Sequence, residues 1–163
     1  MISSPRSLLF LVLTALPLLA QTVQARPKME IEMTVQEEVV DGEGPAVKLI
    51  PAESTAPGDV LVYAIQYANV GEHAASDVVL NGQIPAHTSY IADSADEEAQ
   101  VLFSIDGGET FQPEPVIYTA ETDDGAKEEK TATPDMYTNI RWAVKTPIPA
   151  GTNGRYTYRV RVD

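Results

Sequence analysis

The sequence predicts an all-β protein, an antiparallel sandwich of two sheets with about seven to nine strands, and three observations support this fold class. Short runs in which apolar and polar residues alternate recur along the chain. Clusters of Gly, Pro, Asn and Asp separate these runs and provide turns. No convincing amphipathic helix follows the N-terminal apolar run, and the unequal strand lengths favour a sandwich over a closed barrel.

Three strands are predicted in the first half of the chain. Residues 29–35 (MEIEMTV) alternate with a period of two, which indicates a half-buried strand. The alternation gathers four apolar residues on one face: Met29, Ile31, Met33 and Val35. The DGEGP cluster at 41–45 interrupts this run, and a second strand is expected at 46–51. Residues 60–68 (VLVYAIQYA) are apolar on both faces, which predicts a central strand.

The middle of the chain is expected to add two strands and a hairpin. Residues 76–85 form a strand that ends at Pro85, because proline has no N–H to donate to a neighbouring strand. Residues 88–92 (TSYIA) are a candidate edge strand. Residues 100–113 are expected to form a hairpin, since their central Asp-Gly-Gly supplies the backbone freedom that a tight turn requires.

The last third of the chain has one polar stretch between apolar strands. Residues 121–135 are charged and lack apolar periodicity, which predicts an exposed loop. Residues 136–144 are expected to form a strand whose core residues are Tyr137, Ile140 and Trp142. Residues 155–162 alternate almost perfectly, with Tyr156, Tyr158, Val160 and Val162 on one face and Arg155, Thr157, Arg159 and Arg161 on the other. Cross-strand ion pairs with residues such as Glu30 and Glu32 would explain the arginines, and a strip that docks an acidic partner is the alternative.

Residues 1–25 have the features of a cleavable secretory signal. A lone basic Arg6 precedes an apolar run over 8–20, and small residues lead to Ala25. The run is shorter than the roughly 20 residues that a membrane span needs. We therefore expect an N-terminal strand or extension at 26–45 and one immunoglobulin-like sandwich domain at 46–163, exported to the periplasm or to the cell surface and medium, with no membrane span after cleavage.

Composition excludes several classes of site and partner. The chain has no cysteine, which rules out disulfides, thiolate zinc sites and a cysteine nucleophile. Its formal net charge of −13 disfavours nucleic acid, whose binding depends on Lys and Arg contacts to phosphate. Neither a Gly-x-Ser-x-Gly elbow nor a His-Glu-x-x-His motif is present, so we expect no enzymatic activity. The expected partner is a protein or an envelope polymer.

A resemblance to a known family lies in the segment 57–90 and in the closing strands. The matching residues are Pro57, Gly58, Asp59, Tyr63, Tyr67, Asn69, Gly71, Ala74, Val78, Pro85 and Tyr90. This pattern resembles the bacterial conserved repeat domain family, the domain of unknown function eleven. The chain departs from the family in that Asn81 or Gly82 stands where an acidic residue is usual, and in having one copy of the module. The resemblance implies an exported, non-enzymatic, immunoglobulin-like module of surface structure or adhesion.

Two short motifs are expected to shape turns. Asn69 and Gly71 can adopt the left-handed backbone conformations of a tight corner. The sequence SIDGGETF is similar to the Asp-box pattern, whose residues here are Ser104, Asp106, Gly108, Thr110 and Phe111. The carboxylate of such a motif binds backbone amides while the aromatic ring packs beneath the turn. A single copy does not indicate a propeller, which needs repeated blades, so a structural turn is expected.

A calcium site is the one cofactor hypothesis, and otherwise no cofactor is expected. Acidic residues cluster at 93–98, and calcium prefers six to eight oxygen ligands. Asp93 and Asp96 are the first candidate ligands, although no Asp-x-Asp-x-Asp-Gly spacing is present. A solvated acidic face is the alternative interpretation.

The predicted function is therefore that of an exported structural or interaction module of the bacterial envelope. One variant is self-assembly through strand edges, in which the strand at 29–35 completes the sheet of another copy. The alternative within that variant is that this strand pairs within its own domain. A calcium- or carbohydrate-binding accessory domain is the competing function.

Overall fold

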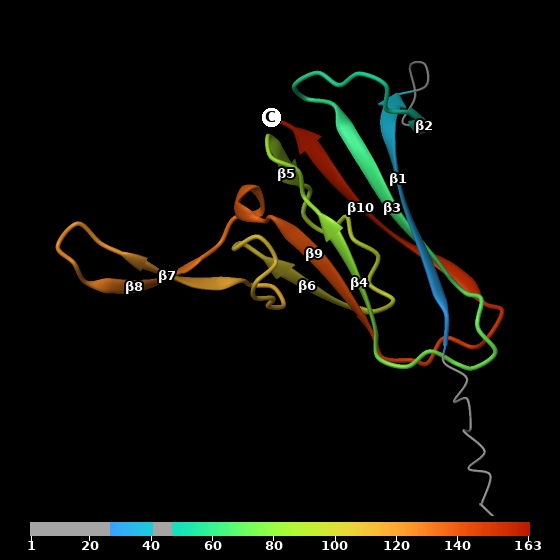
Figure 1. Cartoon of the computed structure of the whole chain (residues 1–163). Helices are drawn as coiled ribbons and strands as arrows, with labels where there is room; N and C mark the ends of the chain where they lie inside the picture. The colour runs from blue at the N-terminus through green and yellow to red at the C-terminus, as the bar shows by residue number, and fades with distance from the viewer. Residues whose placement is uncertain (1–26, 41–46) are drawn as a thin grey trace, which may run out of the picture.

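A computed structural model describes residues 27–40 and 47–163, and it confirms the all-β antiparallel sandwich (Figure 1). The predicted signal at 1–25 and the DGEGP cluster lie outside the described residues. The strands are β1 (Met29–Val40), β2 (Val47–Pro51), β3 (Val60–Asn69), β4 (Val78–Gln83), β5 (Thr88–Tyr90), β6 (Gln100–Ser104), β7 (Ile117–Glu121), β8 (Lys127–Thr131), β9 (Asn139–Val144) and β10 (Asn153–Val162). The described part contains one helical turn, η1 (Pro134–Met136), and no α-helix.

The larger sheet has five strands in the order β2-β1-β3-β10-β5. The strand predicted to be central, β3, lies in the middle, and the predicted edge strand β5 lies at one edge. β1 pairs with β3 over the whole length of β3, from Met29 opposite Asn69 to Glu38 opposite Val60. The N-terminal strand therefore pairs within its own domain and belongs to the sheet.

The smaller sheet, β4-β9-β6, packs on the larger one through aromatic side chains. Trp142 of β9 stacks on Tyr156 of β10 at a centroid distance of 5.5 Å, and its ring lies 5.9 Å from that of Tyr158. Tyr156 and Tyr158 in turn stack on Tyr67 and Tyr63 of β3. The predicted core residues Tyr137, Ile140 and Trp142 are all buried. Aromatic pairs of this kind contribute about 0.5–1.5 kcal/mol each beyond the area they bury.

Asn69 and Gly71 form the corner between β3 and β4, but not by the mechanism that the sequence predicted. Neither residue is among the described ones with positive φ, so the expectation of left-handed conformations was wrong. Instead the buried Asn69 amide donates to the carbonyls of His73 (2.8 Å) and Ile148 (2.9 Å), and its Oδ1 accepts from the N–H of Gly71. A Cβ on Gly71 would lie 2.5 Å from the backbone nitrogen of Lys28, so glycine is needed for close approach.

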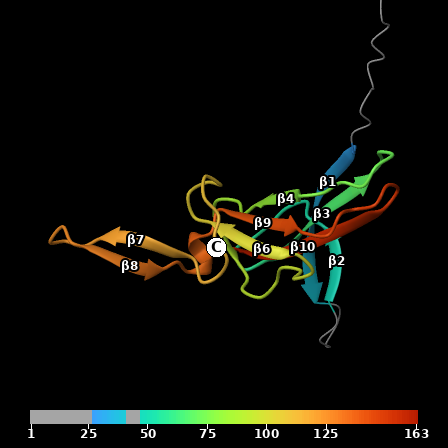
Figure 2. The ribbon, with the colours of Figure 1, turned by 90° about the horizontal axis from the view of Figure 1, so that it is seen from below.

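Residues 121–135 are largely exposed, as predicted, but they do not form only a loop, because they contain a strand, β8. β7 and β8 form an antiparallel hairpin, here called the arm, which projects from the sandwich (Figures 1 and 2). Its turn contains Gly125 at φ +81° and a backbone bond from Thr122 N to Ala126 O of 2.8 Å. Main-chain pairing joins the two strands of the arm, and every residue of β8 is exposed. Because the sequence signal for a strand is apolar alternation, the pattern gave no indication of this hairpin.

The buried tyrosines of the core should ionise at higher pH than tyrosines of an unfolded chain. Burial is the first cause that raises the pKa of five tyrosines: Tyr63, Tyr90, Tyr137, Tyr156 and Tyr158. An unfolded tyrosine has a pKa of about 10, so the folded state keeps these protons to higher pH than the unfolded chain does. This contribution to stability is complete below about pH 10 and is lost as the pH rises above it.

Alkaline titration followed by tyrosinate absorbance and by circular dichroism tests this expectation. We expect delayed ionisation of a subset of the seven tyrosines, coupled to loss of the β spectrum. Ionisation of all seven near pH 10 with an unchanged spectrum would contradict it.

Candidate interaction surface and end pocket

The Asp-box residues are brought together as predicted, and they hold a turn. Ser104 Oγ donates to Asp106 Oδ1 (2.6 Å) and accepts from the N–H of Gly108 (2.9 Å). The N–H of Thr110 donates to both carboxylate oxygens of Asp106 at 2.9 and 3.1 Å. The hydrogen bonds from Ser104 and then from Thr110 hold the pKa of Asp106 below its ordinary value.

Phe111, the aromatic residue of this motif, packs on a cation rather than within the core. The guanidinium carbon of Arg141 lies 3.5 Å from the ring centroid, and Arg141 Nε donates to Asn81 Oδ1 (2.7 Å). The half-buried ring therefore attaches the turn to the outer side of the smaller sheet.

Asp96, a candidate calcium ligand, closes one edge of the larger sheet. Its carboxylate accepts from the N–H (2.7 Å) and the Oγ1 (2.9 Å) of Thr157, and Ser94 Oγ accepts from the N–H of Arg159 (3.0 Å). β5 is short and pairs only with Val160–Val162 of β10. The side chains of Asp96 and Ser94 accept the backbone hydrogen bonds of β10 where β5 does not reach. Asp93 lies in the same loop with φ +57°. No group of three or more metal-ligating side chains is found within 27–40 and 47–163, and calcium binding at Asp93 and Asp96 stays a prediction.

One arginine of β10 forms an ion pair across the larger sheet. Arg159 Nε lies 3.2 Å from Glu38 Oε2, whose side chain is mostly covered. The predicted partners Glu30 and Glu32 were wrong for this arginine, and Glu30 instead lies 3.4 Å from Lys28 Nζ. The pairing is diagonal, because Glu38 lies opposite Val60 while Arg159 lies opposite Val62.

The apolar face of β1 is exposed, although the sequence predicted a half-buried strand. Ile31, Met33 and Val35 lie opposite Tyr67, Ile65 and Tyr63, so they are on the core-facing side of the larger sheet. They are nevertheless 57%, 44% and 37% exposed, and we call them the inner strip. The expectation of a half-buried face was wrong for these three residues because the smaller sheet does not cover them (Figure 2), whereas Met29 is partly buried against the core.

A second apolar group lies on the opposite face of the larger sheet, on β1 and on its neighbour β2. Val40 lies opposite Val47, and Leu49 lies opposite Glu38, which places all three apolar residues on the outer side of the larger sheet. Val40, Val47 and Leu49 are 68%, 51% and 41% exposed, and we call them the outer strip. β1 and β2 together, here called the wing, thus carry exposed apolar side chains on both faces.

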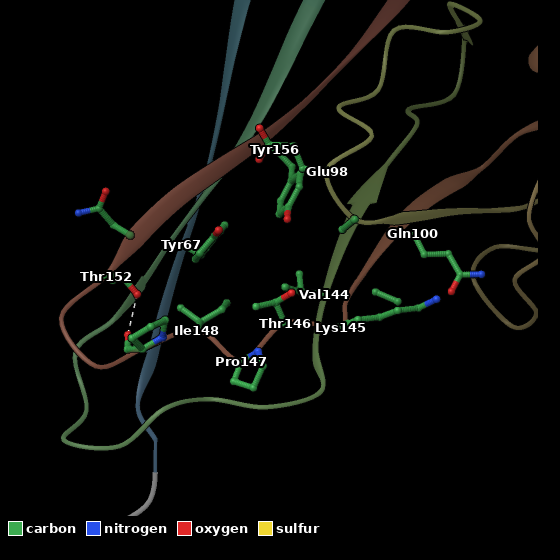
Figure 3. A pocket seen from close by; sticks show the side chains of 14 residues that line it. Tyr67, Glu98, Gln100, Val144, Lys145, Thr146, Pro147, Ile148, Thr152 and Tyr156 are labelled. Carbon is green, nitrogen blue, oxygen red and sulfur yellow. Dashed lines mark hydrogen bonds between the residues drawn. The ribbon is translucent and has the colours of Figure 1, made fainter.

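A pocket of about 390 Å³ opens between the sheets at one end of the sandwich (Figure 3). Tyr67 and Tyr156 form one wall, and Pro147 and Ile148 of the β9–β10 connection form another. Glu98, Gln100, Lys145 and Thr152 supply polar groups at its margin. Burial, followed by the proximity of Tyr67 and Glu98, raises the pKa of Tyr156, which favours the neutral form of its hydroxyl. Apolar walls with a few polar groups are typical of small-molecule sites.

Sequence reasoning missed the outer strip and the pocket. Alternation shows that a strand has an apolar face, but it does not show whether a second sheet covers that face. The pocket residues come from four separate segments and share no local pattern.

The chain matches no family model, and comparisons with curated proteins and with solved structures give no match either. The resemblance to the conserved repeat domain family therefore rests on the residues that carry it and stays a prediction. Among the described residues, no helix has the length and apolar character required to cross a membrane.

The Asp-box geometry predicts that Ser104→Ala destabilises the fold. The substitution leaves the N–H groups of Asp106 and Gly108 without their shared acceptor. Because this turn is only part-buried, we expect a loss of about 0.5–1.5 kcal/mol in the free energy of unfolding. Urea unfolding measures the difference in the free energy of unfolding. An unchanged unfolding midpoint would contradict the structural role of Ser104.

Asp106→Asn tests the carboxylate of the same turn. A lowered pKa in the folded state stabilises the fold above about pH 4, the ordinary range of aspartate, and this contribution is lost on acidification. The stability difference between wild type and variant should therefore shrink as the pH falls. If the difference in the free energy of unfolding between wild type and Asp106→Asn did not change with pH, the stabilising role of the ionised carboxylate would be contradicted.

Proposed function

We propose that this chain is an exported, non-enzymatic interaction module of the bacterial envelope or cell surface, and that the wing is its contact surface. The observation that carries the proposal is the inner strip, a row of apolar side chains that points to the core side of the sheet and stays exposed. Export is supported by the signal-like sequence at 1–25.

Exposed apolar side chains gathered on neighbouring strands mark sites of association. Large apolar residues scattered singly on a surface are ordinary, whereas contiguous patches are characteristic of interfaces. The inner and outer strips place six such residues on two paired strands. β2 also has an open edge within the described residues, and an open edge offers backbone hydrogen bonds to a partner.

The polar motifs support a structural rather than a catalytic role. The carboxylates of Asp96 and Asp106 are both engaged by backbone N–H groups of nearby segments. These interactions account for the residues without a substrate.

Co-sedimentation with envelope fragments of the producing bacterium tests the proposed function. We expect the exported protein to sediment with the fragments, and Ile31→Thr/Met33→Thr to remain in the supernatant. Threonine keeps strand propensity while it reduces the apolar area of the inner strip.

Ile117→Thr is the matched control. Ile117 is an exposed apolar strand residue on the arm, 37% exposed, and it lies outside the wing. If wild type stays in the supernatant, or if the wing variant sediments like the control, the wing is not the contact surface.

A carbohydrate-binding accessory role is the second candidate, and the end pocket favours it. Its tyrosine wall offers an apolar platform, and the carboxylate, amide and ammonium at its margin can form hydrogen bonds with hydroxyl groups.

Calorimetric titration with soluble envelope glycans and with calcium tests this candidate. Glycan binding should release heat, and Glu98→Gln/Lys145→Met should reduce it without unfolding the protein, because both residues are exposed. Heat on calcium titration that Asp93→Asn abolishes would support the predicted metal site. Flat titrations with glycans and with calcium would discard both forms of the accessory role.

A further inference from the structure

The smaller sheet leaves one strand position empty above the inner strip. β6 lies over β5, since Phe103 and Tyr90 have ring centroids 4.9 Å apart, and β9 lies over β10 through Trp142. β4 is next in this order, and it approaches β3. The following position lies over β1, where the described strands place nothing on Ile31, Met33 and Val35.

Other segments occupy parts of the outer edges of the two sheets. Asp96 and Ser94 occupy the β10 edge beyond β5, and Gln112 exchanges two backbone hydrogen bonds with Phe103 of β6 (2.7 and 2.9 Å). In the described chain, β2 pairs only with β1, and β4 pairs only with β9. Among the described residues, β2 and β4 thus have open edges, and these two edges differ in sequence and in position.

The open β2 edge has the side chains that the empty position requires. A strand added beside β4 would direct alternate residues onto the inner strip, because side chains alternate between the faces of a sheet. Val47 and Leu49 are two residues apart, lie on one face of β2 and are exposed. These two side chains are apolar, as are Ile31, Met33 and Val35, so contact between the two groups would bury apolar surface on both sides.

We propose that copies of this chain associate head to tail, with the β2 edge of one copy added to the β4 edge of the next. Val47 and Leu49 of the first copy then cover the inner strip of the second. This inference rests on the proposed function, because it names the partner of the wing. The two halves of the contact are different surfaces, so the association is heterologous and propagates into open chains unless a rotation closes it into a ring.

Sedimentation velocity of the exported, processed protein at rising concentration tests the inference. Wild type should form a series of oligomers, and Met33→Glu or Leu49→Glu should each weaken association by more than about tenfold, because each places a charge in an apolar contact. Ile117→Glu, on the arm, is the matched control and should behave as wild type.

Mixing the two variants distinguishes head-to-tail contact from contact between identical surfaces. Met33→Glu keeps an intact β2 edge and Leu49→Glu keeps an intact inner strip, so an equimolar mixture should form dimers that do not grow. If two inner strips met instead, Leu49→Glu would associate like wild type, and the proposal would be wrong.

Cysteine cross-linking provides a second measurement. The chain has no cysteine, so Met33→Cys and Leu49→Cys introduce single thiols. Oxidation of their mixture should yield the mixed dimer faster than either variant forms its own dimer. A protein that stays monomeric at all concentrations and gives no mixed dimer overturns the self-association, and if it still sediments with envelope fragments through the wing, the proposed function stands without it.

Discussion

The contact between Trp142 and the tyrosines of β10 joins the two sheets, and the rest of the sandwich is arranged around it. The indole is fully buried, stacks on Tyr156, contacts Tyr158 and donates its Nε1–H to the carbonyl of Asp96 (2.9 Å). The same aspartate binds Thr157 through its carboxylate. One side chain thus connects the smaller sheet, the larger sheet and the loop that closes the β10 edge, in a chain that has no disulfide to supply such a link.

The unequal widths of the sheets follow from the position of this contact. Three strands centred on β9 cover the side of the larger sheet that contains β10, and they leave the wing beyond their reach. Within the wing, β1 is paired on both sides, with β3 and with β2. The exposed apolar side chains of the wing are not covered by other parts of the described fold. The proposed contacts of this protein are therefore placed on the wing.

The sequence predicted the strands that carry an apolar face, and with them most of the two sheets. Residues 60–68 and 155–162 are examples, because burial of one side chain in two leaves a clear alternation. The arm was not predicted, since its strand β8 is charged and polar and has no apolar alternation. The role of Asp96 was not predicted either, because its partner Thr157 is distant in sequence. Exposure of the inner strip depends on the width of the opposite sheet, which no local pattern contains.

The tip of the arm lies apart from the packed core (Figure 1). The arm joins the sandwich where Ala132 N donates to Val116 O (2.8 Å), and both of these residues are buried while the strands beyond them are largely solvated. Length and sequence at its tip are therefore decoupled from the packing of the core. The hairpin is a natural place for evolution to vary, or for an engineer to insert a displayed peptide, with little effect on the stability of the domain that bears it.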